Sequence, residues 1–119
     1  HYIAKGAHVQ NSTIAEGCNV YGDLEFSILF AGVYVAPGAE VHSSIIMPGA
    51  RIEEGAKVQY AIVAEDAVVG AGAVVGQRPE NVENKEEWGV AVVGPGAHVP
   101  AGGSVAPQEM LDADEAAKN

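Results

Sequence analysis

The sequence has little of what several classes of protein need. A single cysteine, Cys18, rules out an internal disulfide framework and fits a reducing compartment. No apolar run approaches the roughly 18 residues that cross a bilayer, and no stretch resembles a signal peptide. We therefore expect a cytoplasmic protein without a membrane partner.

Basic residues are also scarce. The 119 residues include six Lys and Arg against 16 Asp and Glu, which gives a formal net charge of −10. Nucleic acids and anionic membrane surfaces are bound through patches of Lys and Arg, and six scattered residues do not form one. The composition thus excludes nucleic acid as a partner.

Large side chains are few, although apolar residues make up 48% of the sequence. Only 6% of the residues are aromatic, and Ala, Val and Ile supply most of the apolar content. Such a composition favours thin, regular layers over a core of large side chains.

An aliphatic residue returns along the chain in steps of mostly six or five residues. From Val35 to Val69 the steps are six, five, six and again six, five, six, which gives a period of seventeen. Neither a helix nor a plain strand has this spacing. A short strand and a tight turn account for each step, and three steps close one coil of a triangular prism. The series is Ile3, Val9, Ile14, Val20, Leu24, Leu29, Val35, Val41, Ile46, Ile52, Val58, Val63, Val69 and Val75.

The residues between these aliphatic positions fit the corners of such a prism. Glycine usually stands three residues after the aliphatic residue, where a tight corner needs a positive φ angle. A small residue follows, usually alanine, and Cys18 occupies this slot once. The five-residue step carries serine at one place, in Ser12, Ser27 and Ser44, where we expect hydroxyl groups to hydrogen-bond along the stack.

These features predict an all-β fold, a single-stranded parallel β-helix of about six coils built from hexapeptide repeats. Residues 1–107 form the column, and a charged segment, 76–89, leaves it as a loop between the fifth and sixth coils. The sequence does not determine which face of the prism contains Val93 after the loop. Residues 108–119 form an acidic tail that is a candidate for a capping helix. Because the repeat is already in progress at the first residues, we expect a fragment of a longer protein.

The sequence offers no convincing catalytic, cofactor-binding or metal-binding residue. His8, His42 and His98 adjoin inward aliphatic residues and should point outward. His8 and His42 lie two coils apart, roughly 10 Å, which is too far to share a zinc ion. Cys18 is interpreted as a buried thiol rather than a nucleophile. The three serines repeat at one place in successive coils, which is typical of a structural role.

Outward aromatic side chains are the best candidates for function. Large apolar groups on the outside of a small domain usually contact another domain or subunit. We therefore predict an interface, between domains or between subunits, at five residues. They are Phe26 and Tyr60, which share one outward column, Phe30 and Tyr34 nearby, and Trp88 in the charged loop.

Four stretches are more specific than the skeleton of Val, Gly and Ala that all hexapeptide repeats share. They are residues 15–22 (AEGCNVYG), 26–33 (FSILFAGV), 44–49 (SIIMPG) and 88–94 (WGVAVVG). These stretches resemble the C-terminal β-helix domain of bacterial glucose-1-phosphate adenylyltransferase. The likeness runs from Tyr2 to about Leu111.

The resemblance implies a left-handed β-helix, an exception among parallel crossovers. It implies a parent nucleotidyltransferase that forms ADP-glucose and pyrophosphate from ATP and glucose 1-phosphate with Mg²⁺, in glycogen biosynthesis. In that family a preceding catalytic domain carries the chemistry, and the β-helix serves tetramer assembly, packing on the catalytic domain and the allosteric response. The present chain is accordingly expected to be inactive alone and to bind no cofactor, and no catalytic residue is carried over to it.

Two other functions stay open. A trimeric hexapeptide acyltransferase that uses acyl-CoA would need a histidine at a subunit interface, with His42 as the candidate base and the loop 76–89 beside the cofactor groove. A scaffold or a non-catalytic regulatory subunit would need no active site. The repeat alone does not separate a catalytic subunit from a regulatory one.

Overall fold

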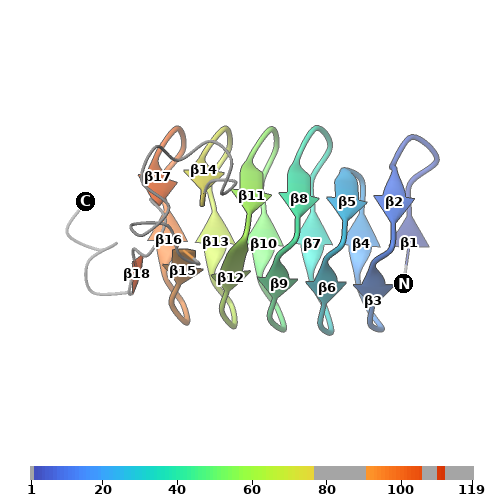
Figure 1. Ribbon diagram of the computed structural model, residues 1–119, viewed down its shortest axis with the longest axis horizontal. Coiled ribbons are helices and arrows are strands. Elements are labelled where there is room, and N and C mark those ends of the chain that lie inside the picture. Colours follow the sequence, from blue (N-terminus) through green and yellow to red (C-terminus); the bar gives the residue numbers. More distant parts are fainter. Residues whose placement is uncertain (1, 77–90, 106–109, 112–119) are drawn as a thin grey trace.

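The computed structural model describes residues 2–76, 91–105 and 110–111. These residues form 18 short strands and no helix, as the all-β prediction requires (Figure 1). In this part of the chain there is accordingly no helix long and apolar enough to span a membrane.

Three parallel sheets of six strands each make up the column. We call them sheets A, B and C, in the order in which the chain visits them. Sheet A contains β1 (Tyr2–Ile3), β4 (Asn19–Val20), β7 (Tyr34–Val35), β10 (Arg51–Ile52), β13 (Val68–Val69) and β16 (His98–Val99). Sheet B contains β2 (Val9–Gln10), β5 (Asp23–Glu25), β8 (Glu40–His42), β11 (Lys57–Gln59), β14 (Val74–Val75) and β17 (Ser104–Val105). Sheet C contains β3 (Thr13–Ile14), β6 (Ile28–Leu29), β9 (Ile45–Ile46), β12 (Ala61–Val63), β15 (Ala91–Val93) and β18 (Met110–Leu111).

Figure 1 shows the hand of the coil. The strands of sheet A run upward in the fainter, more distant layer, and those of sheets B and C run downward in front of them. Successive coils advance from right to left in this view. A coil that turns in this sense is left-handed, so the hand implied by the resemblance is confirmed.

The inward positions of the three sheets form one apolar core. The register places Val35 between Val20 and Ile52 of the neighbouring coils, and all three side chains are completely buried. Burial of one such aliphatic side chain contributes about 1.5–3 kcal/mol to folding. Every member of the predicted aliphatic series between Val20 and Val75 is at most 1% exposed, which confirms this part of the inward series.

Cys18 fills a corner position that alanine occupies in later coils, for example at Ala50 and Ala67. All three side chains are completely buried. The Cys18 thiol donates a hydrogen bond to the carbonyl oxygen of Phe30 at 3.0 Å. The prediction of a buried structural thiol is confirmed.

One corner keeps its shape without glycine. Asp66 has a φ angle of 56° at the place where Gly49 of the preceding coil has 76°. Aspartate tolerates this left-handed conformation better than most residues do. The amide of Asp66 donates to the carbonyl of Pro48 at 3.1 Å, just as the amide of Gly49 donates to that of Ala31 at 3.0 Å. The corner is therefore defined by the backbone ladder, with glycine as its usual occupant.

The charged segment falls within the fifth coil, between β14 and β15. Strand β14 belongs to sheet B, and the next strand, β15, joins sheet C, where Val93 pairs with Val63. This finding identifies the face that Val93 rejoins. It also corrects the prediction that the segment separates the fifth coil from the sixth, because a periodic count does not carry across an insertion of arbitrary length. Residues 77–90, and with them nearly all of the predicted loop 76–89, lie outside the described residues.

The column continues past residue 107. Strand β18 pairs with β15, and Leu111 stands opposite Val93. Sheet C thus includes two residues that the sequence analysis assigns to the acidic tail 108–119. Met110 and Leu111 are therefore strand rather than part of the predicted capping helix, and the other residues of 108–119 lie outside the described part of the chain.

Candidate interaction surface

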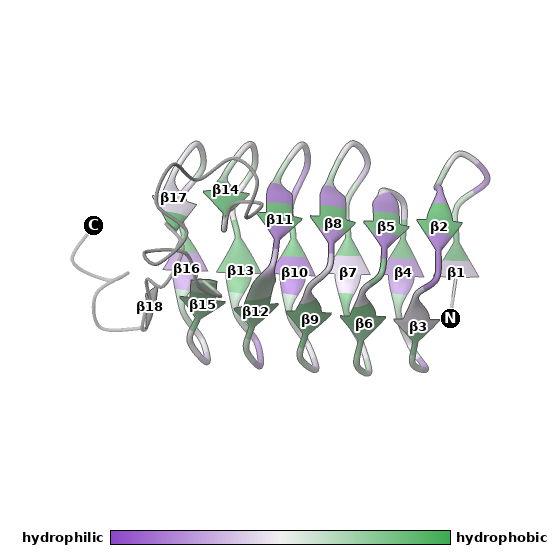
Figure 2. Cartoon of the chain, viewed as in Figure 1, coloured by the Kyte–Doolittle hydropathy of each residue, from purple (hydrophilic) through white to green (hydrophobic). Residues whose placement is uncertain are grey.

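Sheet C carries a column of aliphatic side chains on its outer face. The register aligns Ile28 with Ile45, Ile45 with Ile62, and Ile62 with Val92. Ile28 is 41% exposed and Ile45 is 37% exposed. Figure 2 shows the corresponding strands, β6, β9, β12 and β15, in the colour of hydrophobic residues. The face is therefore an apolar surface outside the core.

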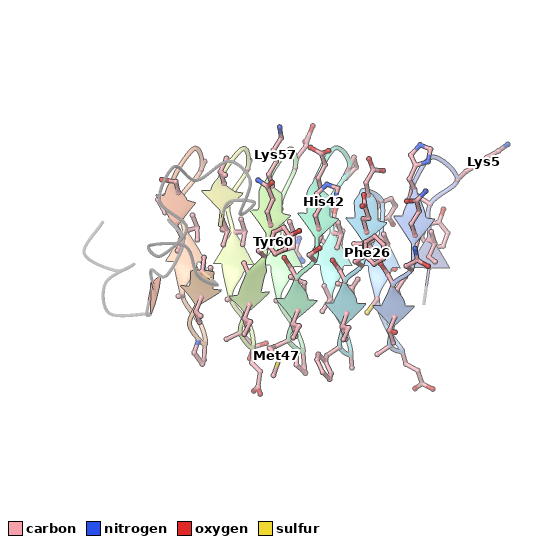
Figure 3. The ribbon with its side chains drawn as sticks, viewed as in Figure 1. Lys5, Phe26, His42, Met47, Lys57 and Tyr60 are labelled. Carbon is pink, nitrogen blue, oxygen red and sulfur yellow. The ribbon has the colours of Figure 1, made fainter. Side chains whose placement is uncertain are left out.

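Larger side chains border this column of aliphatic residues at the two edges of sheet C. In the second coil Phe26 precedes Ile28 and Phe30 follows it, and the two rings are 58% and 41% exposed. Figure 3 shows Phe26 and Tyr60 along one edge of sheet C and Met47 at the opposite edge. We call this surface the sheet C patch and define it as Phe26, Ile28, Phe30, Ile45, Met47, Tyr60 and Ile62.

The backbone at Phe26 and Tyr60 is strained. Their φ angles are 50° and 47°, in the left-handed region that favours glycine and asparagine. Asn11 takes the same corner in the first coil with a φ of 48°. A bulky residue in this conformation costs about 1–2 kcal/mol. Ser43 takes the same corner in the third coil with a φ of 49°, so this conformation belongs to a turn that recurs in four successive coils.

The three outer faces differ in charge. Sheet B exposes Asp23, Glu25, Glu40 and Lys57, and sheet A exposes Arg51. Among the described outward strand positions of sheet C, none is charged. On a chain with a net charge of −10, an uncharged face is unusual and favours contact with an apolar partner.

Tyr34 belongs to a different surface. It lies on the outer face of sheet A, where the ring centroids of Tyr21 and Tyr34 are 5.8 Å apart and those of Tyr2 and Tyr21 are 5.6 Å apart. The guanidinium carbon of Arg51 lies 4.5 Å from the centre of the Tyr34 ring. These four side chains form a continuous row of contacts across the first four coils, which we call the tyrosine stack, although neighbouring rings are tilted by 48° and 52°.

The structure therefore places the four described interface residues of the prediction on two different faces of the column. Phe26, Phe30 and Tyr60 border sheet C, Tyr34 lies on sheet A, and Trp88 is outside the described residues. Sequence reasoning missed the aliphatic column between them. A signal was present, because Ile28 and Ile45 each stand one position before an inward residue and must face outward.

His42, the candidate base of an acyltransferase, lies on sheet B. Its Nδ1 atom is 3.5 Å from Oε2 of Glu25, and its Nε2 atom is 3.8 Å from Oε1 of Glu40. The side chain is only 18% exposed, and Nδ1 is buried without a hydrogen-bond partner among the described residues. His8 immediately precedes β2 of the same sheet, two coils away, as predicted. Within the described residues no group of three or more His, Cys, Asp and Glu could hold a metal ion.

The repeated serines form hydrogen bonds from one coil to the next. Ser27 and Ser44 are buried, and each hydroxyl oxygen accepts a hydrogen bond from a backbone amide of the next coil. Ser12 makes the same contact with the amide of Ser27 at 3.1 Å. The structural role predicted for these hydroxyls is confirmed.

Three parallel sheets wound into one left-handed column define a hexapeptide-repeat β-helix domain. A family model described as GlmU-like, C-terminal hexapeptide, matches residues 3–94. The chain belongs to this family.

Two curated relatives of the same name are similar to this chain over nearly its whole length. The chain is 37% identical over 117 residues to a glucose-1-phosphate adenylyltransferase of Acetivibrio thermocellus, in a match that covers 94% of this chain and 27% of the relative. It is 30% identical over 115 residues to the enzyme of the same name from Desulfitobacterium hafniense strain DCB-2, covering 97% of this chain and 28% of the relative. The resemblance noted in the sequence is confirmed, and the chain spans about a quarter of the length of these relatives.

Among solved structures, WeeI from Acinetobacter baumannii AYE matches with a TM-score of 0.43 and 20% sequence identity, covering 91% of this chain and 52% of that chain.

Proposed function

We propose that this chain is the C-terminal assembly and regulatory domain of a glucose-1-phosphate adenylyltransferase. The observation that carries the proposal is the match of 94% and 97% of the chain to two enzymes of that name. The parent enzyme would form ADP-glucose and pyrophosphate from ATP and glucose 1-phosphate, in glycogen biosynthesis and in the cytoplasm.

The chemistry is assigned to the part of the parent enzyme outside this chain. Nucleotidyl transfer requires groups that position phosphates and Mg²⁺, so ATP and Mg²⁺ would bind the catalytic domain. The β-helix would act as a rigid column that holds the subunits of a homo-oligomer, a tetramer by resemblance, and that takes part in the allosteric response. The sheet C patch and the tyrosine stack offer the contact surfaces for these roles.

An assay of the native gene product tests this proposal. The polypeptide that carries these residues is expected to release pyrophosphate and form ADP-glucose when it is mixed with ATP, glucose 1-phosphate and Mg²⁺. The 119-residue chain alone is expected to form none. A native product without this activity would refute the adenylyltransferase role for the polypeptide and would leave the non-catalytic regulatory subunit, the scaffold and the acyltransferase.

A second candidate is a trimeric acyltransferase that uses acyl-CoA, because Nδ1 of His42 is buried and accepts or donates no hydrogen bond among the described residues. The surrounding charge opposes it. Glu25 and Glu40 flank the ring at 3.5 and 3.8 Å, and the phosphates of coenzyme A would be repelled by both carboxylates. Isothermal titration with acetyl-CoA decides the question, because binding that is lost in His42→Ala would favour the acyltransferase.

A further inference from the structure

We propose that His42 is a pH-sensitive link between successive coils on the outer face of sheet B. When the imidazole ring is protonated, it joins the second coil to the third through the carboxylate of Glu25, and the link is lost when the ring is neutral. This link would act in the column whatever reaction the parent enzyme catalyses.

The pairing of parallel strands places two carboxylates beside His42. Strand β5 lies next to β8, and the register puts Glu25 of the second coil opposite His42 of the third. Glu40 stands two residues before His42 on β8, so both side chains point to the outer face. The Nδ1 atom of the ring is 3.5 Å from Oε2 of Glu25, and Nε2 is 3.8 Å from Oε1 of Glu40. Each ring nitrogen therefore faces a carboxylate.

The other polar groups near the ring come from the two strands that flank β8. Strand β11 of the fourth coil places the uncharged Gln59 opposite His42. The same strand carries Lys57, whose Nζ atom is 3.8 Å from Oε2 of Glu40. Strand β5 adds Asp23, in register with Glu40. Three carboxylates and one ammonium group thus share this face with the imidazole, and the contacts run across the second, third and fourth coils.

The Nδ1 atom of His42 lacks a partner that a proton would give it. It is buried and makes no hydrogen bond among the described residues, although a carboxylate oxygen of Glu25 lies within 4 Å. A neutral imidazole has one N–H group, so one of its two nitrogens then directs a lone pair at a carboxylate. An imidazolium has two N–H groups and can donate a charge-assisted hydrogen bond to each carboxylate. Buried polar atoms without a partner are rare, and protonation of the ring accounts for this one.

The sign of the pH dependence follows from these contacts. The folded chain offers the imidazolium two acceptors that the unfolded chain lacks, so the contribution is present at acidic pH and is lost as the pH rises. Burial opposes the charged ring, whose side chain is 18% exposed, and two carboxylates within 4 Å favour it. Histidine ordinarily changes its charge between about pH 5 and pH 8, a range in which carboxylates ordinarily stay ionised.

Hydrogen exchange of the native gene product tests the proposal at the coils that the link joins. The amide of Ser43 donates to the carbonyl oxygen of Glu25 at 2.8 Å. The amide of Tyr60 donates to the carbonyl oxygen of His42 at 3.0 Å. Exchange at both amides is followed by mass spectrometry at about pH 5.5 and about pH 8, and each rate is divided into the intrinsic rate at that pH. The amide of Met47, which is bonded between two coils on sheet C, is the internal reference.

The expected result is about fivefold greater protection of the Ser43 and Tyr60 amides at the lower pH, a difference that disappears in His42→Gln. His98→Gln, on the outer face of sheet A, is the matched control and should keep the whole difference. An equal pH dependence in the wild type and His42→Gln would overturn the proposal. Greater protection at the higher pH in the wild type would also overturn it, because burial of the charged ring would then outweigh the two carboxylates.

A second variant tests the link from its other end. Glu25→Gln leaves the imidazole of His42 in place and removes the charge of the acceptor on the second coil. It should reduce the difference in protection at the Ser43 amide, whether or not His42→Gln folds. A Glu25→Gln variant that kept the whole difference would overturn the proposal.

Discussion

The hydroxyl oxygen of Ser27 accepts a hydrogen bond from the backbone amide of Ser44, which lies directly above it in the next coil, at 3.2 Å. The same hydroxyl donates to the carbonyl oxygen of Glu25 at 3.0 Å. Ser12 and Ser44 repeat the arrangement one coil away on either side, so a ladder of hydroxyls joins the first four coils at the corner between sheets B and C. The ladder ends at Ala61, one coil before the place between β14 and β15 where the charged segment interrupts the repeat in the sequence.

The Ser27→Ala substitution is expected to lower the free energy of unfolding by about 1–3 kcal/mol. It removes the acceptor of a buried amide and leaves that amide without a partner. A denaturant titration measures the change. Ser104→Ala, at an exposed position of sheet B, is the control and should change stability by less than about 0.5 kcal/mol. Equal effects at the two positions would show that the ladder contributes nothing specific.

Adjacent isoleucines of β9 should respond very differently to truncation. Ile46 is completely buried and Ile45 is 37% exposed. Ile46→Ala is expected to cost about 2–5 kcal/mol, because it leaves a cavity between coils, and Ile45→Ala about 1 kcal/mol or less in the 119-residue chain. Chemical denaturation of both variants tests the assignment of inward and outward sides. A larger loss for Ile45→Ala would contradict the register of sheet C.

Phe26→Asn is expected to stabilise the 119-residue chain by about 0.5–1 kcal/mol, because asparagine tolerates the left-handed φ angle of 50° found there. Phe26→Val is the contrasting variant and should destabilise the chain, since β-branched residues avoid this conformation. Thermal or chemical unfolding distinguishes them. If both variants lost equal stability, packing of the phenyl ring and not backbone strain would govern this corner.

Tyr34 and Arg51 should be energetically coupled. The guanidinium group lies over the tyrosine ring at 4.5 Å, in an exposed cation–π contact worth about 0.5–1 kcal/mol. A double-mutant cycle with Tyr34→Leu and Arg51→Gln measures the coupling free energy. Additive effects of the two substitutions would show that the stacked geometry carries no energy of its own.

Periodic features of the fold could be predicted from the sequence because equivalent positions of successive coils pack against their neighbours in the same way. The inward residues Val35 and Ile52, the small slot of Cys18 and the role of Ser27 all follow from a position that recurs. Once the register of one coil is known, these positions are determined for its neighbours.

Other features depend on where the repetition fails or on what faces outward. Val93 could not be placed because residues 77–90 interrupt the count. Tyr21 contacts Tyr2 and Tyr34 from a shortened turn in the second coil, where a side chain on Gly22 would collide with the carbonyl oxygen of Ala39. The aliphatic column of the sheet C patch escaped prediction because Ile45 and Ile46 are equally apolar, so that the regular series singles out only the inward residue.

The intact mass of the native gene product tests the proposed origin of this domain most directly. The 119 residues have a mass of 12.2 kDa and span 27% of one relative, so a mass of roughly four times that value is expected. A polypeptide of this size has room for a catalytic domain. A native product near 12.2 kDa would leave no such room and would contradict the assignment to a glucose-1-phosphate adenylyltransferase.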